Sequence, residues 1–277
     1  CGMNCPFCAT GQAGLTRNMS TAEIVDQIVR ANQAIARGEL GGIHKHEDGT
    51  PERVNNIVFM GMGEPMANEA NVWAAVERLH GAIGLSARHI TISTVGLVPG
   101  IRTLTGRPLP VNLAVSLHAA NDELRNELVP INKRYPLRQL MEACADYLAV
   151  KGRRLSFEWA LIAGTNDRDS DAKELATLCR QFRLPAHVNL IPLNPTPGYP
   201  TTGSSLARVE QFRDLFRGET ATAQGVREHQ SRRGRADRAG QHAERDRQRA
   251  GGHRGIAGRG RVRRPHHEGG GGTRRRE

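Results

Sequence analysis

The stretch "NIVFMGMGEP" (56–65) joins a short apolar run to a glycine-rich turn that ends in a carboxylate. An apolar run of this length is typical of a strand buried on both faces of a parallel sheet. Glycines directly after a strand let the backbone approach a ligand closely. The stretch therefore predicts a strand whose carboxyl end carries a binding turn with Gly63 and Glu64. Taken alone, the turn is equally consistent with an ordinary strand-to-helix connection.

Working outward, strand-like runs alternate with helix-like segments along the chain. A capping box, Ser20-Thr-Ala-Glu23, starts the first expected helix, and apolar residues follow it at helical spacing. The expected strands are 56–61, 89–94, 111–116, 154–162 and 186–192. The later helices are expected around 72–79, over 121–150 with breaks at Pro130 and Pro136, over 168–182 and over 204–216. This alternation predicts an α/β fold with a parallel sheet, and helices on one outer face would make it a barrel.

Polar residues stand where the expected strands end. Ser93 follows one strand, Ser116, Leu117 and His118 follow the next, and Asn194 follows the last. Each is an ordinary surface or turn residue when it is taken alone. Active sites of parallel barrels lie at the carboxyl ends of the strands, so together these positions predict contacts to one ligand.

Three cysteines, Cys1, Cys5 and Cys8, lie within the first eight residues in the spacing CxxxCxxC. Three thiolates on a four-iron cluster leave one iron open for a substrate or cofactor. The alternative is a zinc site, which needs a fourth ligand. Cys144 and Cys179 lie in helical apolar patterns and are expected in the core. His44 and His46 lie in a polar loop that nothing in the sequence fixes near the cysteines. The spacing favours an iron–sulfur cluster.

The net charge of +11 is distributed unevenly. Residues 217–277 hold 17 Arg, no Lys and 7 acidic residues, whereas residues 1–216 are nearly neutral at +1. A basic segment suggests a nucleic-acid partner. Arg17, Lys133 and Arg134 are candidate phosphate contacts, although such residues are more often solvated surface. The sequence has no secretory signal and no apolar run long enough to cross a membrane.

Five stretches together resemble the RlmN family and its relative Cfr, which are radical S-adenosylmethionine (SAM) methyltransferases. They are "CGMNCPFCATGQAGLTRN", "NIVFMGMGEPMAN", "ITISTVGLVPGI", "LAVSLHAANDELRNELVPIN" and "HVNLIPLNPTPG", and the resemblance covers about residues 1–216. It implies a partial (β/α)6-type radical SAM barrel over 1–216, followed by a basic tail over 217–277. It also implies a cytoplasmic, monomeric enzyme that methylates carbon 2 of an adenine in 23S rRNA and in some tRNAs.

The resemblance further implies the cofactors and their ligands. Cys1, Cys5 and Cys8 would hold a [4Fe–4S] cluster, reduced by a donor such as flavodoxin or ferredoxin. The implied SAM contacts are Gly63, Glu64, Ser93, Ser116, Leu117, His118 and Asn194. In this family one SAM methylates a protein cysteine, and a second SAM yields a 5′-deoxyadenosyl radical that activates that methyl group. A second cysteine then helps to release the product, and the substrate base lies unstacked in the pocket.

The chain departs from the family pattern at both ends. It opens at the cluster cysteines, so we expect Cys1 to be a truncation point, with the first barrel strand and the product-releasing cysteine missing. The chain has no cysteine after Cys179, and residues 231–243 read "SRRGRADRAGQHA" where the family carries its methyl-bearing cysteine. Neither family catalytic cysteine is therefore expected here.

The Arg- and Gly-rich composition of 217–277 cannot bury a core, so we expect a disordered tail. Its abrupt start favours a frameshift over a genuine RNA-binding tail. Three hypotheses follow for the chain: an incomplete copy of an RNA methyltransferase, a radical SAM enzyme of altered chemistry, or a non-catalytic RNA-binding remnant.

Overall fold

The computed structural model describes residues 1–42, 45–185 and 187–220 of the chain. Its strands form one parallel sheet in the order β1-β2-β3-β4-β5, with bounds Ile57–Phe59, Ile90–Thr94, Asn112–Ser116, Leu155–Leu161 and His187–Pro192. The strand order follows the chain order, so each connection crosses to the neighbouring strand. An α/β fold with a parallel sheet is confirmed.

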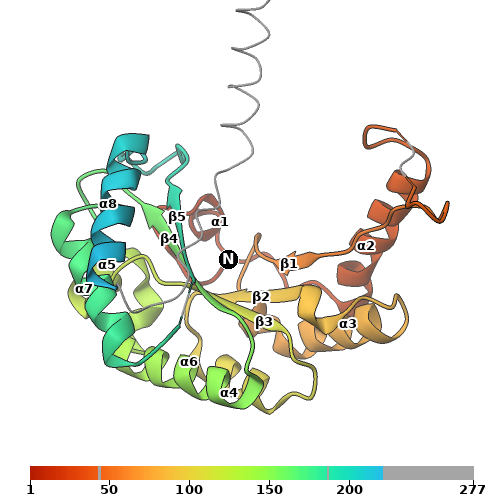
Figure 1. Ribbon diagram of the computed structural model, residues 1–277, viewed down its shortest axis with the longest axis horizontal. Helices are drawn as coiled ribbons and strands as arrows, with labels where there is room; N and C mark the ends of the chain where they lie inside the picture. The colour runs from red at the N-terminus through yellow and green to blue at the C-terminus, as the bar shows by residue number, and fades with distance from the viewer. Residues whose placement is uncertain (43–44, 186, 221–277) are drawn as a thin grey trace, which may run out of the picture. The chain divides into compact units, whose positions relative to one another are not determined.

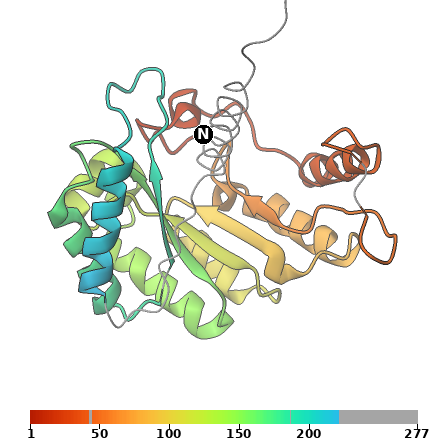
Figure 2. The same cartoon turned by 45° about the horizontal axis from the view of Figure 1, so that its top comes forward.

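The helices that follow the strands lie along one side of the sheet. They are α3 (Glu69–Gly81), α4 (Val98–Gly106), α5 (Asp122–Leu128), α6 (Leu137–Lys151), α7 (Asp169–Gln181) and α8 (Leu206–Glu219). Figures 1 and 2 show α4 and α6 beneath the sheet and the short α1 (Ala9–Gln12) on the opposite side. Helix α2 (Thr21–Ala36) packs against α3. Among the described residues, no helix is both long and apolar enough to span a bilayer.

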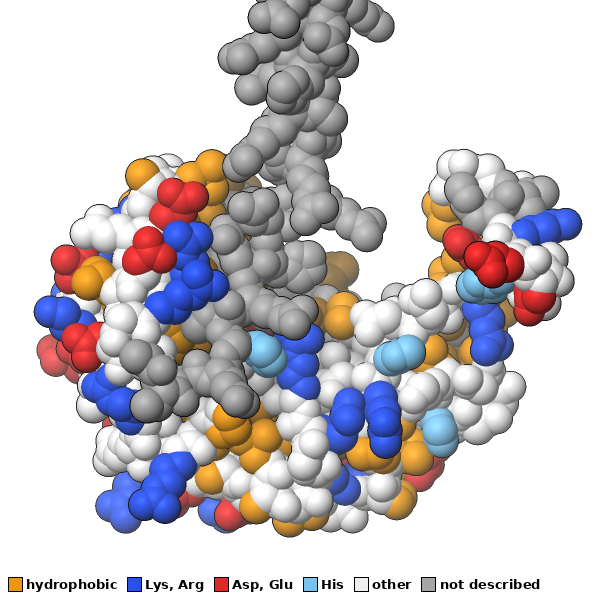
Figure 3. Space-filling model, viewed as in Figure 1, with side chains coloured by type: hydrophobic (Ala, Val, Ile, Leu, Met, Phe, Trp, Pro, Cys, Tyr) orange, Lys and Arg blue, Asp and Glu red, His pale blue; other side chains and the backbone are white. Residues whose placement is uncertain are grey.

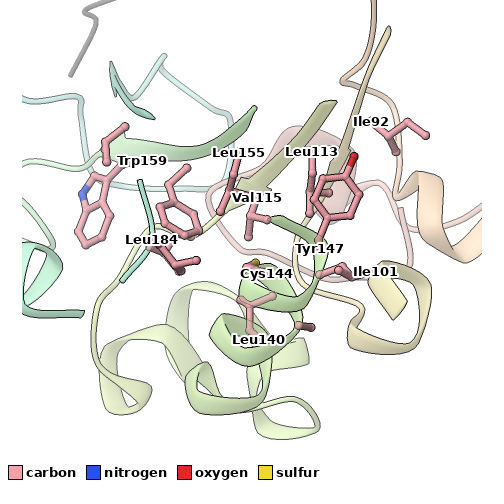
Figure 4. Packing of buried hydrophobic residues seen from close by; sticks show 14 of the residues in the cluster. Ile92, Ile101, Leu113, Val115, Leu140, Cys144, Tyr147, Leu155, Trp159 and Leu184 are labelled. Carbon is pink, nitrogen blue, oxygen red and sulfur yellow. The ribbon is translucent and has the colours of Figure 1, made fainter. Parts of the chain in front are cut away.

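The main core fills the space between the sheet and these helices. Figure 4 shows Leu113, Val115 and Leu155 of the strands facing Leu140 and Cys144 of α6. Because successive strand residues point to opposite faces, the residues between these apolar positions face away from the helices. Cys144 and Cys179 are buried, as expected, and burial raises the pKa of each thiol to about 12.

Several expected boundaries were wrong in detail. The first strand is only three residues long, because Gly61, Met62 and Gly63 have positive φ angles that cannot continue a strand. The expected helix over 121–150 is divided at its prolines into α5, the 3₁₀ turn η3 (Pro130–Lys133) and α6. The last helix runs to Glu219, beyond the expected boundary at 216.

Helix α4 was not expected from the sequence, since it contains a proline and two glycines. The proline, Pro99, lies in the first turn, where backbone N–H groups have no acceptor within the helix, so a residue without an N–H is tolerated. Gly100 allows the close approach of the 3₁₀ turn η1 (Pro65–Asn68), because a Cβ at this position would lie 2.6 Å from Cβ of Met66. The disordered tail and the frameshift expected for 217–277 fall almost wholly on residues 221–277, which lie outside the described residues.

Candidate functional site

Residues 1–14 form a compact segment that we call the cysteine loop. The backbone N–H of Cys8 donates to the carbonyl oxygen of Cys5 (3.1 Å), and α1 begins directly after Cys8. Gly11 is required here, since a Cβ at this position would lie 2.7 Å from the carbonyl oxygen of Cys5. The tight turn therefore holds Cys5 and Cys8 close to each other.

The cysteine loop packs against the carboxyl-end side of the sheet. Cys5 and Phe7 form a second apolar cluster with Leu128, Val129 and Ile162, which follow β3 and β4 in the chain. The ring of Phe7 meets the ring of His118 edge to face, with 5.0 Å between the centroids. The packing thus places Cys5 near the segments that follow β3 and β4.

The donor set of this loop is three thiols, a set that can hold an iron–sulfur cluster. Within residues 1–42, 45–185 and 187–220, no group of three His, Cys, Asp or Glu side chains is arranged to hold a metal ion. The choice between a cluster and a zinc ion stays a prediction. His46 is exposed, and His44 lies outside the described residues.

The surroundings of Cys5 favour the protonated thiol over the thiolate. Burial raises the pKa of Cys5 to about 11, and the neighbouring Cys8 adds to that increase, while Arg125 opposes it. Thiols must lose their protons to bind a metal, so loading the loop would release protons.

Glu64 ties the turn after β1 to the end of β2. Its Oε1 accepts from the backbone N–H of Met66 (2.9 Å), and its Oε2 accepts from the N–H of Val95 (2.7 Å). Burial raises the pKa of this carboxyl group, and the two N–H donors oppose the shift. The Thr94 side chain also hydrogen-bonds to this carboxyl group. A carboxylate has about four lone-pair sites, so it can still accept a bond from a ligand.

The glycine turn before Glu64 is open to solvent. Gly63 has a φ of +147°, and no atom lies within 4 Å of where its Cβ would be. Met62 has a φ of +43°, a conformation that non-glycine residues rarely adopt, and its side chain is 87% exposed. This turn offers backbone groups that no side chain covers.

His118 is held in one orientation by the segment that contains β4. Its Nδ1 accepts from the backbone N–H of Ala160 (3.0 Å), and its carbonyl oxygen accepts from Nδ2 of Asn166 (2.8 Å). An Nδ1 that accepts a bond from a backbone N–H carries no proton, so the ring proton lies on Nε2. Burial, with a smaller effect of Arg125, lowers the pKa of His118 to about 3. The ring is therefore neutral at physiological pH.

The other expected SAM contacts take different positions. Ser93 and Ser116 are half-buried on β2 and β3. Leu117 is fully buried, its backbone N–H donates to the carbonyl oxygen of Glu158 (3.0 Å), and its own carbonyl oxygen accepts from Arg125 (3.0 Å). Asn194 is exposed in the loop after β5, while its neighbour Leu193 packs near Cys5. The structure thus brings Glu64, Ser116 and His118 to the side of the cysteine loop; their binding of SAM stays a prediction.

A row of polar side chains crosses the sheet on the face turned away from the helices. Ser116, Glu158 and Asn189 are paired in register on β3, β4 and β5. Oε1 of Glu158 accepts from Nδ2 of Asn189 (2.8 Å) and from Oγ of Ser156 (3.0 Å). We call Ser116, Glu158 and Asn189 the polar row. Glu158 and Asn189 were missed from the sequence, although "SFEWA" alternates polar and apolar residues in a way that marks one polar face.

Arg125 was also missed, because one arginine in a short helix reads as solvated surface. It is 0% exposed. Its guanidinium donates to the carbonyl oxygens of Val95 (2.7 Å), Ser116 (3.2 Å) and Leu117 (3.0 Å), and to Oδ1 of Asn132 (2.7 Å). One side chain therefore joins the ends of β2 and β3 beside the cysteine loop.

The candidate phosphate contacts are surface residues. Arg17 pairs with Glu23 at 2.7 Å, and Lys133 and Arg134 are exposed. On the face shown in Figure 3, Lys and Arg side chains over α7 and α8 lie among Asp and Glu side chains. Arg208, for example, pairs with Asp169 at 2.7 Å. Nothing in this geometry singles out a phosphate site.

Comparison with known proteins gives a consistent result, although no family model matches the chain. The chain is 56% identical over 216 residues to the probable dual-specificity RNA methyltransferase RlmN of Frankia alni, covering 76% of this chain and 49% of the relative. It is 53% identical to the protein of the same name from Thermobifida fusca, covering 78% and 57%. The chain thus spans about half the length of the curated relatives it matches.

A solved structure agrees with these relatives. The crystal structure of a radical SAM methyltransferase from Sphaerobacter thermophilus matches with a TM-score of 0.74 and 46% identity, covering 83% of this chain and 64% of that chain. The sequence resemblance, the parallel sheet and the position of the cysteine loop therefore point to one conclusion. This chain belongs to the RlmN family of radical SAM methyltransferases.

Proposed function

We propose that this chain contains the cofactor-binding sheet of an enzyme that methylates carbon 2 of adenine in 23S rRNA and in tRNA. The observation that carries this proposal is the packing of the cysteine loop against the strand ends that hold Glu64 and His118. A carbon that is too electron-poor to attack a SAM methyl group needs radical chemistry, which the cofactors supply. The RNA substrates follow from the names of the relatives.

In this proposal Cys1, Cys5 and Cys8 hold a [4Fe–4S] cluster, which supplies an electron to SAM when both are bound. The SAM contacts are the seven positions at the strand ends, Gly63, Glu64, Ser93, Ser116, Leu117, His118 and Asn194. The carboxylate of Glu64 accepts hydrogen bonds from an ammonium group. The neutral ring of His118 keeps its place through the bond from Ala160. The partners are RNA and a one-electron donor such as flavodoxin or ferredoxin, and the proposed location is the cytoplasm.

The experiment is anaerobic reconstitution of the chain with iron and sulfide, followed by incubation with SAM and dithionite. We expect about four irons for each chain and formation of 5′-deoxyadenosine. The variant Cys5→Ser should lose both, whereas the matched control Cys179→Ser, a buried core thiol, should retain both. Reconstituted protein that holds no cluster would remove the basis of the proposal.

Methyl transfer is a separate measurement. Because the 277 residues contain no cysteine after Cys179, we expect SAM cleavage by this chain without methylation of RNA. Mass spectrometry of digested 23S rRNA or tRNA after incubation measures 2-methyladenosine directly. Its detection would contradict the expectation and would show that the family's methyl-bearing cysteine is not required.

A further inference from the structure

Arg125 carries a positive charge into the protein interior, and no anion among the described residues bonds to it directly. Each acceptor that its guanidinium contacts is neutral, namely three backbone carbonyl groups and the side-chain amide of Asn132. Buried charges are normally paired, because an unpaired charge keeps its full desolvation cost. This site therefore contains an excess of positive charge that a bound anion would balance.

Two carboxylates lie near this charge without bonding to it. Glu64 is buried and accepts from the backbone N–H of Val95, the residue whose carbonyl oxygen accepts from Arg125, and in the proposed function Glu64 is paired with the ammonium group of SAM. Asp122 is exposed, and the amide of Asn132 stands between it and Arg125: Nδ2 of Asn132 donates to Asp122 at 2.8 Å. Water screens an exposed carboxylate. The thiol of Cys144 is buried and neutral, since its pKa is about 12. The burial of Arg125 lowers the pKa of the guanidinium to about 10, so it remains charged at neutral pH.

The cysteine loop is the element next to this charge. Nη2 of Arg125 donates to the carbonyl oxygen of Val95, and Val95 packs in the same apolar cluster as Cys5. A four-iron cluster with three thiolate ligands is an anion, and one-electron reduction makes it more negative. Such a cluster would place negative charge next to Arg125.

We propose that Arg125 is a positioning residue that balances the negative charge of a cluster held by the cysteine loop and thereby raises the reduction potential of that cluster. This inference rests on the proposed function, because it requires the cluster. The same guanidinium also bonds to carbonyl groups at the ends of β2 and β3, which holds the charge in place relative to these strand ends. A buried positive charge favours the reduced, more negative cluster, since little water screens it.

The test is an anaerobic redox titration with dithionite, followed by electron paramagnetic resonance of the reduced cluster. In Arg125→Gln, which removes the charge, we expect the ratio of reduced to oxidised cluster at a fixed potential to fall about tenfold. That change corresponds to a potential about 59 mV lower for a one-electron couple. Arg125→Lys keeps the charge but loses the fork of donors, so its potential should stay near that of the unchanged protein.

Arg138→Gln is the matched control, since it makes the same chemical change on an 84% exposed side chain of α6 and should leave the potential unchanged. An unchanged potential in Arg125→Gln would overturn the inference. If only Arg125→Lys folds, an unchanged potential supports the inference and a tenfold fall in the reduced fraction overturns it. Unchanged protein that binds no cluster would instead refute the proposed function, so the two failures are distinguishable.

Discussion

The two faces of strand β4 carry different kinds of side chain and have different tasks. Phe157 and Trp159 point toward the helices and are fully buried, whereas Glu158 points to the opposite face and is only half-buried. The first face excludes water and stabilises the fold. The second places a carboxylate in register with Ser116 and Asn189. One alternating stretch thus supplies both core and site, and substitutions on the two faces should have separable effects.

The largest effect is expected on the helix-facing side. Trp159→Ala should lower the free energy of unfolding by about 3–5 kcal/mol, because it leaves a cavity beside Phe212, whose ring centroid lies 5.7 Å away. Denaturant unfolding followed by circular dichroism measures the change. A loss below about 1 kcal/mol would mean that this face does not depend on tight packing.

A second prediction concerns pH and His118. Its pKa in the folded protein is about 3, and in the unfolded chain the pKa of histidine is about 6.5. As the pH falls below 6.5, His118 takes up a proton in the unfolded chain but stays neutral in the folded protein. Protonation therefore stabilises the unfolded state, and the folded protein loses stability until the pH reaches about 3. The expected loss is about 1.4 kcal/mol for each pH unit in this window.

Unfolding curves at several pH values, compared between the unchanged protein and His118→Gln, isolate this contribution. The variant should show a shallower loss of stability between pH 6.5 and 4. His80→Gln is a control, because His80 is exposed on α3. Parallel pH curves for the unchanged protein and His118→Gln would contradict the neutral, buried ring described above.

The smallest effect on stability is expected in the polar row. Glu158→Gln keeps the shape of the side chain, and it should change the free energy of unfolding by less than about 1 kcal/mol. If this face belongs to the cofactor site, the same variant should bind SAM more weakly in the reconstituted protein, as measured by equilibrium dialysis. A large loss of stability with unchanged SAM binding would assign Glu158 to the fold instead.

The accuracy of the sequence predictions differed between elements for physical reasons. Strand and helix order followed from apolar periodicity, because burial imposes that pattern on both kinds of element. Helix α4 was missed because Pro99 and Gly100 usually break helices, and only contact with Met66 explains the glycine. Arg125 was missed because the carbonyl groups that it contacts come from two strand ends. Contacts of this kind cannot be recognised from the sequence around the arginine.

In the candidate site, too, the sequence predicted some features and missed others. The spacing of the cysteines and the turn Gly63-Glu64-Pro65 indicated two elements of the site. The structure places both elements on one side of the sheet. The hydrogen bonds of Glu64 to Met66 and Val95 could not be predicted, because they depend on how two neighbouring strands end. The polar row was visible as alternation in 154–162, but only strand register shows that Ser116, Glu158 and Asn189 are neighbours.

The three-residue length of β1 has a consequence for amide exchange. β1 is an outer strand of the described sheet and pairs only with β2, through Ile57–Phe59, whereas β3 lies between two partners. Few bonds must open to expose the backbone of β1, so its amide protons should exchange with deuterated solvent long before those of β3. Glu64 follows this strand by five residues and is held to the end of β2 by its separate bond from Val95, so β1 can open while the turn at Glu64 and the centre of the sheet stay in place.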